Sequence, residues 1–167
     1  MPCLLVVVFL HMNSFSRYLY PENILLNLCV EDKTQALMHI AALMETQHQL
    51  DRGKILAGLC AREKLGSTAL GQGVALPHAQ ISELHRPMMA YVSLATPIDF
   101  DSPDGLPVTE LYVLLFPSER VSEHLQMLAD VAGFVCDLPF RKRISESLDI
   151  ASALDNFASW SIAPAST

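Results

Sequence analysis

One histidine lies where its imidazole could carry a reaction. His78 follows Pro77, which keeps the residue before it extended and ends a short apolar run abruptly. The glycine-spaced segment 66–73 leads toward it and supplies backbone N–H groups together with the hydroxyls of Ser67 and Thr68. An imidazole held at the end of a strand beside such donors can act as a nucleophile or as a proton carrier. His78 is therefore the first candidate for a reactive residue, against the alternative of an inert loop histidine.

A second histidine, His124, falls in the first turn of a helix that the apolar spacing predicts from Ser122 onward. The free N–H groups and the dipole of a helix N-terminus favour an anion, although polar residues are also common there for structural reasons. A strand-end His78 and a helix-start His124 could converge on one face of a sheet. Arg62, near the end of an earlier expected helix, either binds that helix's terminal carbonyls or suits a phosphate through its fork of donors.

Several common catalytic and binding motifs are absent from the sequence. The segment from Gly66 to Gly71 has the glycine spacing of a P-loop, but Gln72 stands where the phosphate-binding lysine is required. There is also no third glycine of a dinucleotide fingerprint, no GxSxG nucleophile elbow and no HExxH zinc motif. The remaining histidines are interpreted as structural or solvent-facing, because none has a ligand partner at helical spacing: His11, His39, His48 and His85.

The elements that must position these residues follow from apolar periodicity and from capping and turn residues. Strands are expected over residues 24–30, 89–95 and 111–116, with a short apolar run at 74–76; helices are expected over 32–48 and 52–64, from 122, from 139 and over 149–159. Helices at both ends with strands in the middle predict an α/β fold, a central mixed β-sheet flanked by helices.

Composition narrows the class of protein. The chain has 167 residues, of which 51% are hydrophobic and 17% charged, so intrinsic disorder and a long charged coiled coil are excluded. The net charge of −7 disfavours a nucleic-acid partner, which requires a basic face. The cysteines form no CxxC pair and are expected to be buried, reduced thiols, which is typical of a reducing cytosol: Cys3, Cys29, Cys60 and Cys136.

The first residues, Met1 to Leu10, form an apolar run that is shorter than the roughly 20 residues a membrane span needs. The run also lacks the positive charge of a signal peptide, so no membrane insertion is expected. We interpret residues 1–11 as an atypical apolar extension of the kind that an upstream start would add, residues 12–160 as a single domain, and residues 161–167 as a flexible tail.

The stretch from Arg62 to His78, REKLGSTALGQGVALPH, resembles the active-site signature of IIA domains of the bacterial phosphotransferase system, fructose/mannitol type. Within that family it is most similar to the nitrogen-regulatory branch (IIA-Ntr). The segment from Phe116 to Leu125 resembles the family's second histidine region, and the segment from Tyr20 to Leu28 resembles its usual opening. The likeness runs from about Phe15 to Phe157.

This resemblance implies a phosphotransferase component, a phosphocarrier rather than a small-molecule enzyme, working in the cytoplasm without cofactor or metal. His78 would accept a phosphoryl group from an HPr-like protein, His124 would help to hold the phosphate, and Arg62 and Thr68 would lie nearby. The phosphorylation state would then regulate partners such as sensor kinases or potassium transporters. Ala79-Gln80 departs from the Gly-Lys more usual in this branch, which removes one positive charge beside the site.

Three alternatives remain open at this point. The first is a sugar-specific fructose/mannitol IIA that passes phosphate to a IIB domain, although Gly66-Ser67-Thr68 looks more like the nitrogen branch. The second is a binding module that is no longer phosphorylated. The third is a metal-dependent hydrolase that uses three histidines with one of two aspartates: His78, His85 and His124 with Asp99 or Asp101.

Overall fold

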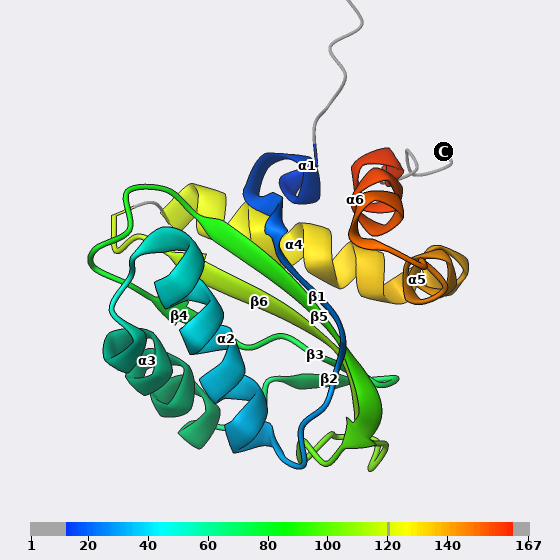
Figure 1. Cartoon of the computed structure of the whole chain (residues 1–167), viewed down its shortest axis with the longest axis horizontal. Helices are drawn as coiled ribbons and strands as arrows, with labels where there is room; N and C mark the ends of the chain where they lie inside the picture. Colours follow the sequence, from blue (N-terminus) through cyan, green and yellow to red (C-terminus); the bar gives the residue numbers. More distant parts are fainter. Residues whose placement is uncertain (1–12, 120, 162–167) are drawn as a thin grey trace, which may run out of the picture.

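The computed structural model describes residues 13–119 and 121–161, and a mixed sheet of six strands forms its centre (Figure 1). The strands are β1 (Leu19–Leu28), β2 (Ala69–Gly71), β3 (Val74–Ala75), β4 (His78–Gln80), β5 (Met88–Ile98) and β6 (Val108–Phe116). The helices are α1 (Ser14–Tyr18), α2 (Lys33–His48), α3 (Arg52–Lys64), α4 (Val121–Cys136), α5 (Leu138–Ser145) and α6 (Ile150–Ser159). The predicted extension, residues 1–11, and residues 162–167 of the predicted tail lie outside these ranges.

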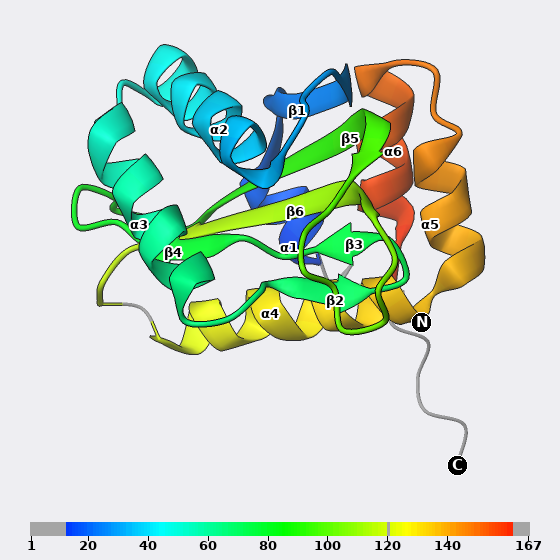
Figure 2. The same cartoon turned by 90° about the horizontal axis from the view of Figure 1, so that it is seen from below.

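Helices cover both faces of the sheet, as the sequence predicts. Helices α2 and α3 pack on one face, and α1, α4, α5 and α6 pack on the other (Figures 1 and 2). Alternate residues of β5 enter different cores: Ala90 and Val92 pack under α2 and α3, whereas Met89 and Tyr91 pack under the other helices. This alternation is the normal consequence of the two-residue period of a strand that is buried on both faces.

The order of the strands brings the ends of distant segments together. The order is β1-β5-β6-β3-β2, and the short strand β4 also pairs with β6. Strand β4 runs parallel to β6, and His78 lies opposite Leu114. Because β6 leads toward α4, the start of β4 and the start of α4 are placed at the same end of the sheet (Figure 2).

Three of the predicted helices begin at an aspartate cap, and the sequence suggested two of these residues, Asp32 and Asp149. The carboxylates of Asp32, Asp51 and Asp149 each accept a hydrogen bond from the backbone N–H three residues later, at 2.8, 3.0 and 2.8 Å. Such a cap satisfies an N–H group that has no partner inside the helix. No helix within the described ranges is long and apolar enough to cross a membrane.

Several element boundaries differ from the expectation: β5 ends at Ile98 rather than at residue 95, and β6 begins at Val108 rather than at residue 111. Strand β1 begins at Leu19 rather than at residue 24, and it contains Pro21, which an edge strand tolerates because its outer N–H groups need no partner. The glycine-spaced segment 66–73 is not loop throughout, since Ala69–Gly71 pairs with β3 as an antiparallel hairpin.

The prediction of buried thiols is wrong for two of the described cysteines. Cys29 and Cys136 are exposed, and Cys60 is half-buried; none of the three forms a disulfide. Cys29 follows the last residue of the edge strand β1, and Cys136 is the last residue of α4. An apolar sequence context therefore did not guarantee burial at the ends of elements. Cys3 lies outside the described residues.

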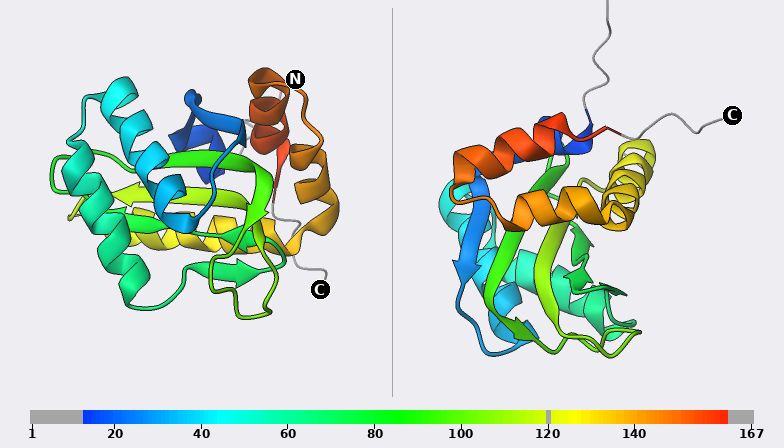
Figure 3. Two further views of the ribbon diagram at one scale, coloured as in Figure 1. Left: turned by 60° about the horizontal axis from the view of Figure 1, so that its bottom comes forward. Right: turned by 90° about the vertical axis from the view of Figure 1, so that its right-hand side faces the viewer.

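The ends of the described chain are held together on the α4 face. Asn13 caps α1 and donates from Nδ2 to the carbonyl of Phe157 in α6 at 3.1 Å. Phe15 stacks on Phe157 with ring centroids 4.9 Å apart and packs edge-on against Trp160 at 5.9 Å. Figure 3 shows α1 beside the C-terminal end of α6. The aromatic side chains thus join the two ends into one core.

A buried ion pair crosses that same core. Arg141 of α5 is the first of three consecutive basic residues, yet it is buried and donates to Glu110 of β6 from Nη2 at 2.6 Å and from Nε at 3.1 Å. The hydroxyl of Tyr91 donates to the same carboxylate at 3.0 Å. Burial, and then the charge of Glu110, raise the pKa of Tyr91 well above its ordinary value. Arg141 also donates to the carbonyl of Gln72 at 3.0 Å and so fixes the β2–β3 hairpin.

We predict that Arg141→Met lowers the free energy of unfolding by about 3–5 kcal/mol, because it leaves the buried Glu110 carboxylate without its cation. Urea unfolding followed by circular dichroism measures the change. The matched control is Lys142→Met, since the neighbouring Lys142 side chain is 73% exposed and its loss should leave the unfolding midpoint unchanged. Equal midpoints for the two variants would contradict a stabilising role of the pair.

Candidate functional site

The backbone around Pro77 fixes which nitrogen of His78 carries a proton. Nδ1 of His78 lies 2.8 Å from the carbonyl oxygen of Leu76, two residues earlier. A carbonyl oxygen can only accept, so Nδ1 is the donor and Nε2 of the neutral ring keeps a free electron pair. The segment is held on the sheet because the Pro77 carbonyl accepts the N–H of Leu114 at 3.0 Å. His78 itself is half-buried, with access to solvent.

Arg62 indicates the same tautomer from the other side of the ring. Its Nε donates to Nε2 of His78 at 3.1 Å, and since an arginine can only donate, Nε2 must be the acceptor. Its Nη1 donates at 2.9 Å to the carbonyl of Gly66, which lies in the loop after the helix and is not one of the helix's own terminal carbonyls. The guanidinium is therefore aimed at the histidine by one contact on each side.

Close packing of α3 on β4 makes this reach possible. A β-carbon placed on Gly58 would lie 3.1 Å from the Cβ of Ala79, which directly follows His78. Arg62 comes one turn after Gly58 and shares its side of the helix. Helix α3 ends at Lys64, and the chain turns at Gly66, whose φ of +147° is readily available only to glycine. The small residue on the helix sets its distance from the strand, and the glycine turns the chain into the loop before Thr68.

His124 occupies the first turn of α4, as the apolar spacing predicts. Its ring stacks on Phe116 with centroids 3.4 Å apart and an interplanar angle of 28°. Burial first, and the nearby charge of His78 second, lower the pKa of His124. A neutral imidazole of this kind can donate from one nitrogen to an anion placed between the two histidines. The structure thus brings His78, Arg62 and His124 together.

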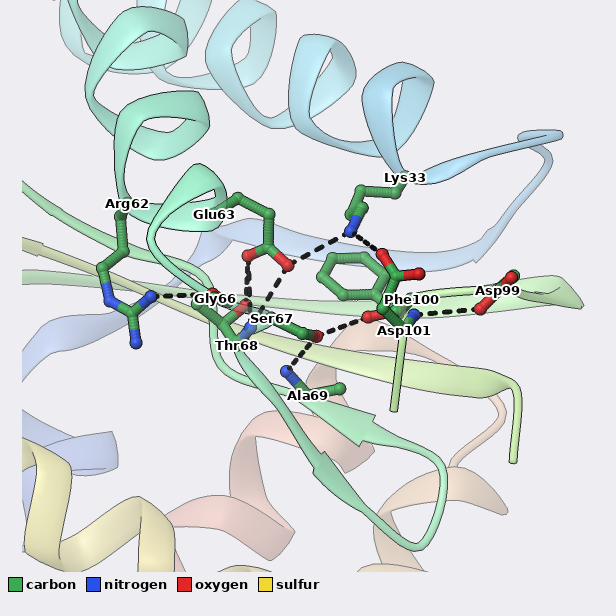
Figure 4. Close-up of polar contacts among 10 residues, drawn as sticks. All are labelled: Lys33, Arg62, Glu63, Gly66, Ser67, Thr68, Ala69, Asp99, Phe100 and Asp101. Carbon is green, nitrogen blue, oxygen red and sulfur yellow. Dashed lines mark hydrogen bonds and ion pairs between the residues drawn. The ribbon is translucent and has the colours of Figure 1, made fainter. Parts of the chain in front are cut away.

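Thr68 is placed differently from these three residues. It is buried, and its hydroxyl donates to Oε2 of Glu63 at 2.7 Å, while its N–H lies 3.2 and 3.3 Å from the two carboxylate oxygens of Glu63 (Figure 4). Both of its donors are therefore engaged by Glu63. The implied contact between Thr68 and a phosphate stays a prediction.

Sequence reasoning missed Glu63 and Lys33. Lys33 is the first residue of α2, and its Nζ lies 2.6 Å from Asp101 and 3.4 Å from Glu63 (Figure 4). Burial alone would lower the pKa of Lys33, but the hydrogen bond to Asp101 and the charge of Glu63 hold it above its ordinary value. The one signal in the sequence was the adjacency of Glu63 to Arg62 at a helix end, which is common on solvated surfaces.

The other described histidines lie away from this site. His39 and His85 are exposed, and His48 is half-buried and lies 2.6 Å from the side-chain oxygen of Asn23. Within residues 13–119 and 121–161, no three His, Cys, Asp or Glu side chains come together as a metal site would require. The hydrolase alternative therefore has no ligand set among them. His11 lies outside the described residues.

Exposed apolar side chains stand beside the site residues. Leu65 follows the last residue of α3 and is 85% exposed, and Val121 and Leu125, on either side of His124, are 61% and 62% exposed. Leu70 of β2 is exposed as well. Exposed apolar side chains in the segments that carry the site residues mark a candidate surface for binding another protein. We call these four residues the apolar rim.

Several known proteins resemble this chain in sequence over most of its length. Residues 17–159 match the family model described as phosphoenolpyruvate-dependent sugar phosphotransferase system, EIIA 2. A protein named nitrogen regulatory protein from Pseudomonas aeruginosa is 38% identical over 144 residues, covering 86% of this chain and 93% of the relative. Another of the same name, from Bradyrhizobium diazoefficiens, is 38% identical over 129 residues, covering 77% and 84%.

Solved structures share the fold. The crystal structure of nitrogen regulatory protein IIA-Ntr from Neisseria meningitidis aligns with a TM-score of 0.78 and 31% identity, over 83% of this chain and 94% of that one. IIA mannitol from Escherichia coli aligns with a TM-score of 0.71 and 17% identity, over 84% and 99%. The second likeness is one of fold alone.

The pH dependence of His124 tests the geometry of the site. We predict that His124 titrates below its ordinary pKa of 6.5, and that His78→Gln moves the value upward but not fully back, because burial remains. Titration of the ring protons by NMR measures both values. Since the pKa is lower in the folded than in the unfolded protein, this group's contribution to stability is present above pH 6.5 and is lost as the pH falls from that value through the lower pKa of the folded protein. A titration at or above 6.5 in the parent protein would contradict the placement of His124.

Proposed function

The chain belongs to the EIIA 2 family of the phosphoenolpyruvate-dependent phosphotransferase system, and from this premise we propose that it is a phosphocarrier that takes a phosphoryl group on Nε2 of His78. The observation that carries the proposal is the pair of hydrogen bonds that leave the electron pair of Nε2 as the ring's only nucleophile. The ring therefore needs no further base to activate it, because the attacking nitrogen is already unprotonated.

The transfer step needs only the imidazole of His78 as the attacking group and the donor's imidazole as the leaving group. Nε2 of His78 forms a bond to phosphorus while the phosphorus–nitrogen bond of a donor phosphohistidine breaks. The electron pair of the broken bond leaves with the donor's imidazole. The proton on Nδ1 of His78 stays in place, and the carbonyl of Leu76 stabilises the positive charge that the ring gains. Transfer of this kind depends on positioning and on charge stabilisation.

Arg62 and His124 supply that stabilisation in our proposal. As phosphorus approaches Nε2, the Arg62 guanidinium exchanges its contact with Nε2 for contacts with the phosphoryl oxygens, which it binds through charge-assisted hydrogen bonds. His124 lies on the neighbouring helix start and donates to the same group. A phosphoryl group on His78 also favours the cationic form of His124, because an opposite charge nearby raises the pKa of a histidine.

We infer that the donor is an HPr-like protein and that it docks on the apolar rim around the two histidines. A protein donor must bring its own phosphohistidine to within bonding distance of His78, which requires a surface contact on both sides of the site. Leu65 and Leu70 belong to the segment between Arg62 and His78, and Val121 and Leu125 belong to the first turns of α4 with His124. We therefore propose that the protein acts in the cytoplasm, where such a donor would phosphorylate it.

The nitrogen-regulatory role is favoured over the sugar-specific one. The relatives at 38% identity are named nitrogen regulatory protein, whereas a fructose-specific EIIA component from Haloferax volcanii is 31% identical over 97 residues, 58% of this chain. In the regulatory role, the roughly −1.5 to −2 charges of a phosphoryl group change which partner docks on the rim. Sensor kinases and potassium transporters are the partners we propose.

The first test is intact mass after incubation with phosphoenolpyruvate, enzyme I and HPr. We expect one acid-labile phosphoryl group on the parent protein and none on His78→Ala, which removes the acceptor nitrogen. His85→Ala is the matched control, because His85 is an exposed loop histidine and its loss should leave labelling complete. Full labelling of His78→Ala would overturn the proposal.

A second prediction concerns rates. Arg62→Ala should slow phosphoryl acceptance about a hundredfold, as the loss of one donor to a developing charge does elsewhere. His124→Ala should slow it about tenfold while some acceptance remains. Rapid-quench measurement with the phosphorylated donor in excess gives both rate constants. A His124→Ala rate equal to that of the parent would make His124 a bystander.

A further inference from the structure

We propose that Glu63 is a positioning residue for phosphoryl transfer, because it holds the loop that aims Arg62 at His78. This inference rests on the proposed function of His78 as the phosphoryl acceptor. Glu63 and Arg62 are neighbours at the end of α3, and their side chains point to opposite sides of the chain that follows the helix (Figure 4). Arg62 reaches the reactive histidine, and Glu63 reaches the loop.

The carboxylate of Glu63 accepts hydrogen bonds from both donors of Thr68, its hydroxyl and its backbone N–H. It accepts the hydroxyl of Thr68 at 2.7 Å and the N–H of Thr68 at 3.2 and 3.3 Å. The side chain of Glu63 is 8% exposed, so water competes little for these contacts. Hydrogen bonds to a charged acceptor are among the stronger ones in proteins. Thr68 is therefore fixed relative to the last turn of α3.

The ammonium group of Lys33 pairs with this carboxylate on the side away from Arg62 (Figure 4). Lys33 lies 3.4 Å from Glu63 and also pairs with Asp101 at 2.6 Å. The Nζ of Lys33 lies 5.3 Å from the centre of the Phe100 ring. The backbone carbonyl of Phe100 accepts a hydrogen bond from the hydroxyl of Ser67. Helix α2 and the loop after β5 are thus joined to the segment between α3 and β2.

The link from this loop to the histidine is short. Gly66 stands between Glu63 and Thr68; its N–H donates to the carbonyl of Glu63 at 3.2 Å, and its own carbonyl accepts Nη1 of Arg62 at 2.9 Å. That second contact holds the guanidinium plane, and Nε then lies 3.1 Å from Nε2 of His78. If Thr68 is released, the Gly66 carbonyl moves with it and Arg62 loses its aim.

This geometry separates positioning from docking. Glu63 is too deeply buried to touch a protein donor, so its removal should lower kcat for phosphoryl acceptance and leave KM for the donor unchanged. A displacement of about an ångström at a positioned catalytic group can cost up to a hundredfold in rate. The glutamine variant keeps the shape and one acceptor oxygen, and the alanine variant keeps neither.

The test is a comparison of kcat and KM with phosphorylated HPr as the varied donor. We expect Glu63→Gln to lower kcat about tenfold and Glu63→Ala to lower it further. Thr68→Val, which removes only the hydroxyl, should have an effect similar to that of Glu63→Gln. The double variant should be no slower than the slower single variant, because both changes break the same contact.

Asp130→Asn is the matched control. Asp130 is a buried carboxylate that accepts the N–H of Ser14 and the amide of Gln126, both at 2.8 Å, but it joins α1 to α4 rather than the loop to α3. We expect this control to lower the urea midpoint and to leave kcat unchanged. A fall in kcat with Asp130→Asn as large as with Glu63→Gln would reduce Glu63 to a general stabilising residue and overturn the proposal.

A second readout needs no phosphate and applies to the folded variants. The hydrogen on Nε of Arg62 should exchange slowly with solvent in the parent protein, because it is donated to His78, and faster in Glu63→Gln and in Thr68→Val. Unchanged exchange in both variants would overturn the link from loop to arginine. Thr68→Val alone slowing transfer, with Glu63→Gln at the parent rate, would show instead that Thr68 contacts the phosphate directly.

The outcomes separate the two proposals. A parent protein that takes up no phosphoryl group overturns the proposed function and the role of Glu63 in transfer together. A parent protein that is phosphorylated on His78, with Glu63→Gln equal to it in kcat, overturns the role of Glu63 only.

Discussion

The hydrogen bond between Nδ1 of His78 and the carbonyl of Leu76 is the interaction on which the chemistry of this protein depends. It joins a side chain to the backbone two residues earlier, so its geometry is set by the path of the chain through Pro77. As long as it holds, the ring presents Nε2 unprotonated to the outside, and the same contact can stabilise the ring when it becomes positively charged. A free imidazole in water has no carbonyl held against Nδ1 that would keep the proton on that nitrogen.

The rest of the fold keeps that short segment in place and surrounds it with donors. Strand β6 holds Pro77 and His78 from one side and leads toward α4 with His124. Helix α3 lies close on β4 at Gly58 and brings Arg62 to the ring. Farther away, Arg141 fixes the hairpin at Gln72 from within the opposite core. Arg62 and Arg141, which lie far apart in the sequence, thus both contact the segment between residues 66 and 78.

The parts of this arrangement that local chemistry determines were predictable from the sequence. The aspartate caps marked the starts of α2 and α6, and Pro77 marked the end of the short strand before His78. Resemblance to a known family brought Arg62, His78 and His124 into one site, and the structure places them together. The same reasoning gave Thr68 a contact with phosphate, whereas its hydroxyl donates to Glu63.

The remaining contacts could not be predicted because the partners lie far apart in the sequence. Arg141 was one of three adjacent basic residues, and only the position of Glu110, 31 residues away, shows which of them turns inward. Lys33 and Glu63 are 30 residues apart, and nothing local marks them as partners. The exposure of Cys29 and Cys136 likewise depends on which elements cover them.

The most direct test of the central claim is to identify the phosphorylated nitrogen by NMR. The protein would be labelled with a nitrogen isotope, phosphorylated through enzyme I and HPr, and examined for coupling between phosphorus and each ring nitrogen. The account predicts coupling to Nε2 of His78, with Nδ1 still protonated. Coupling to Nδ1 of His78, or to either nitrogen of His124, would contradict it.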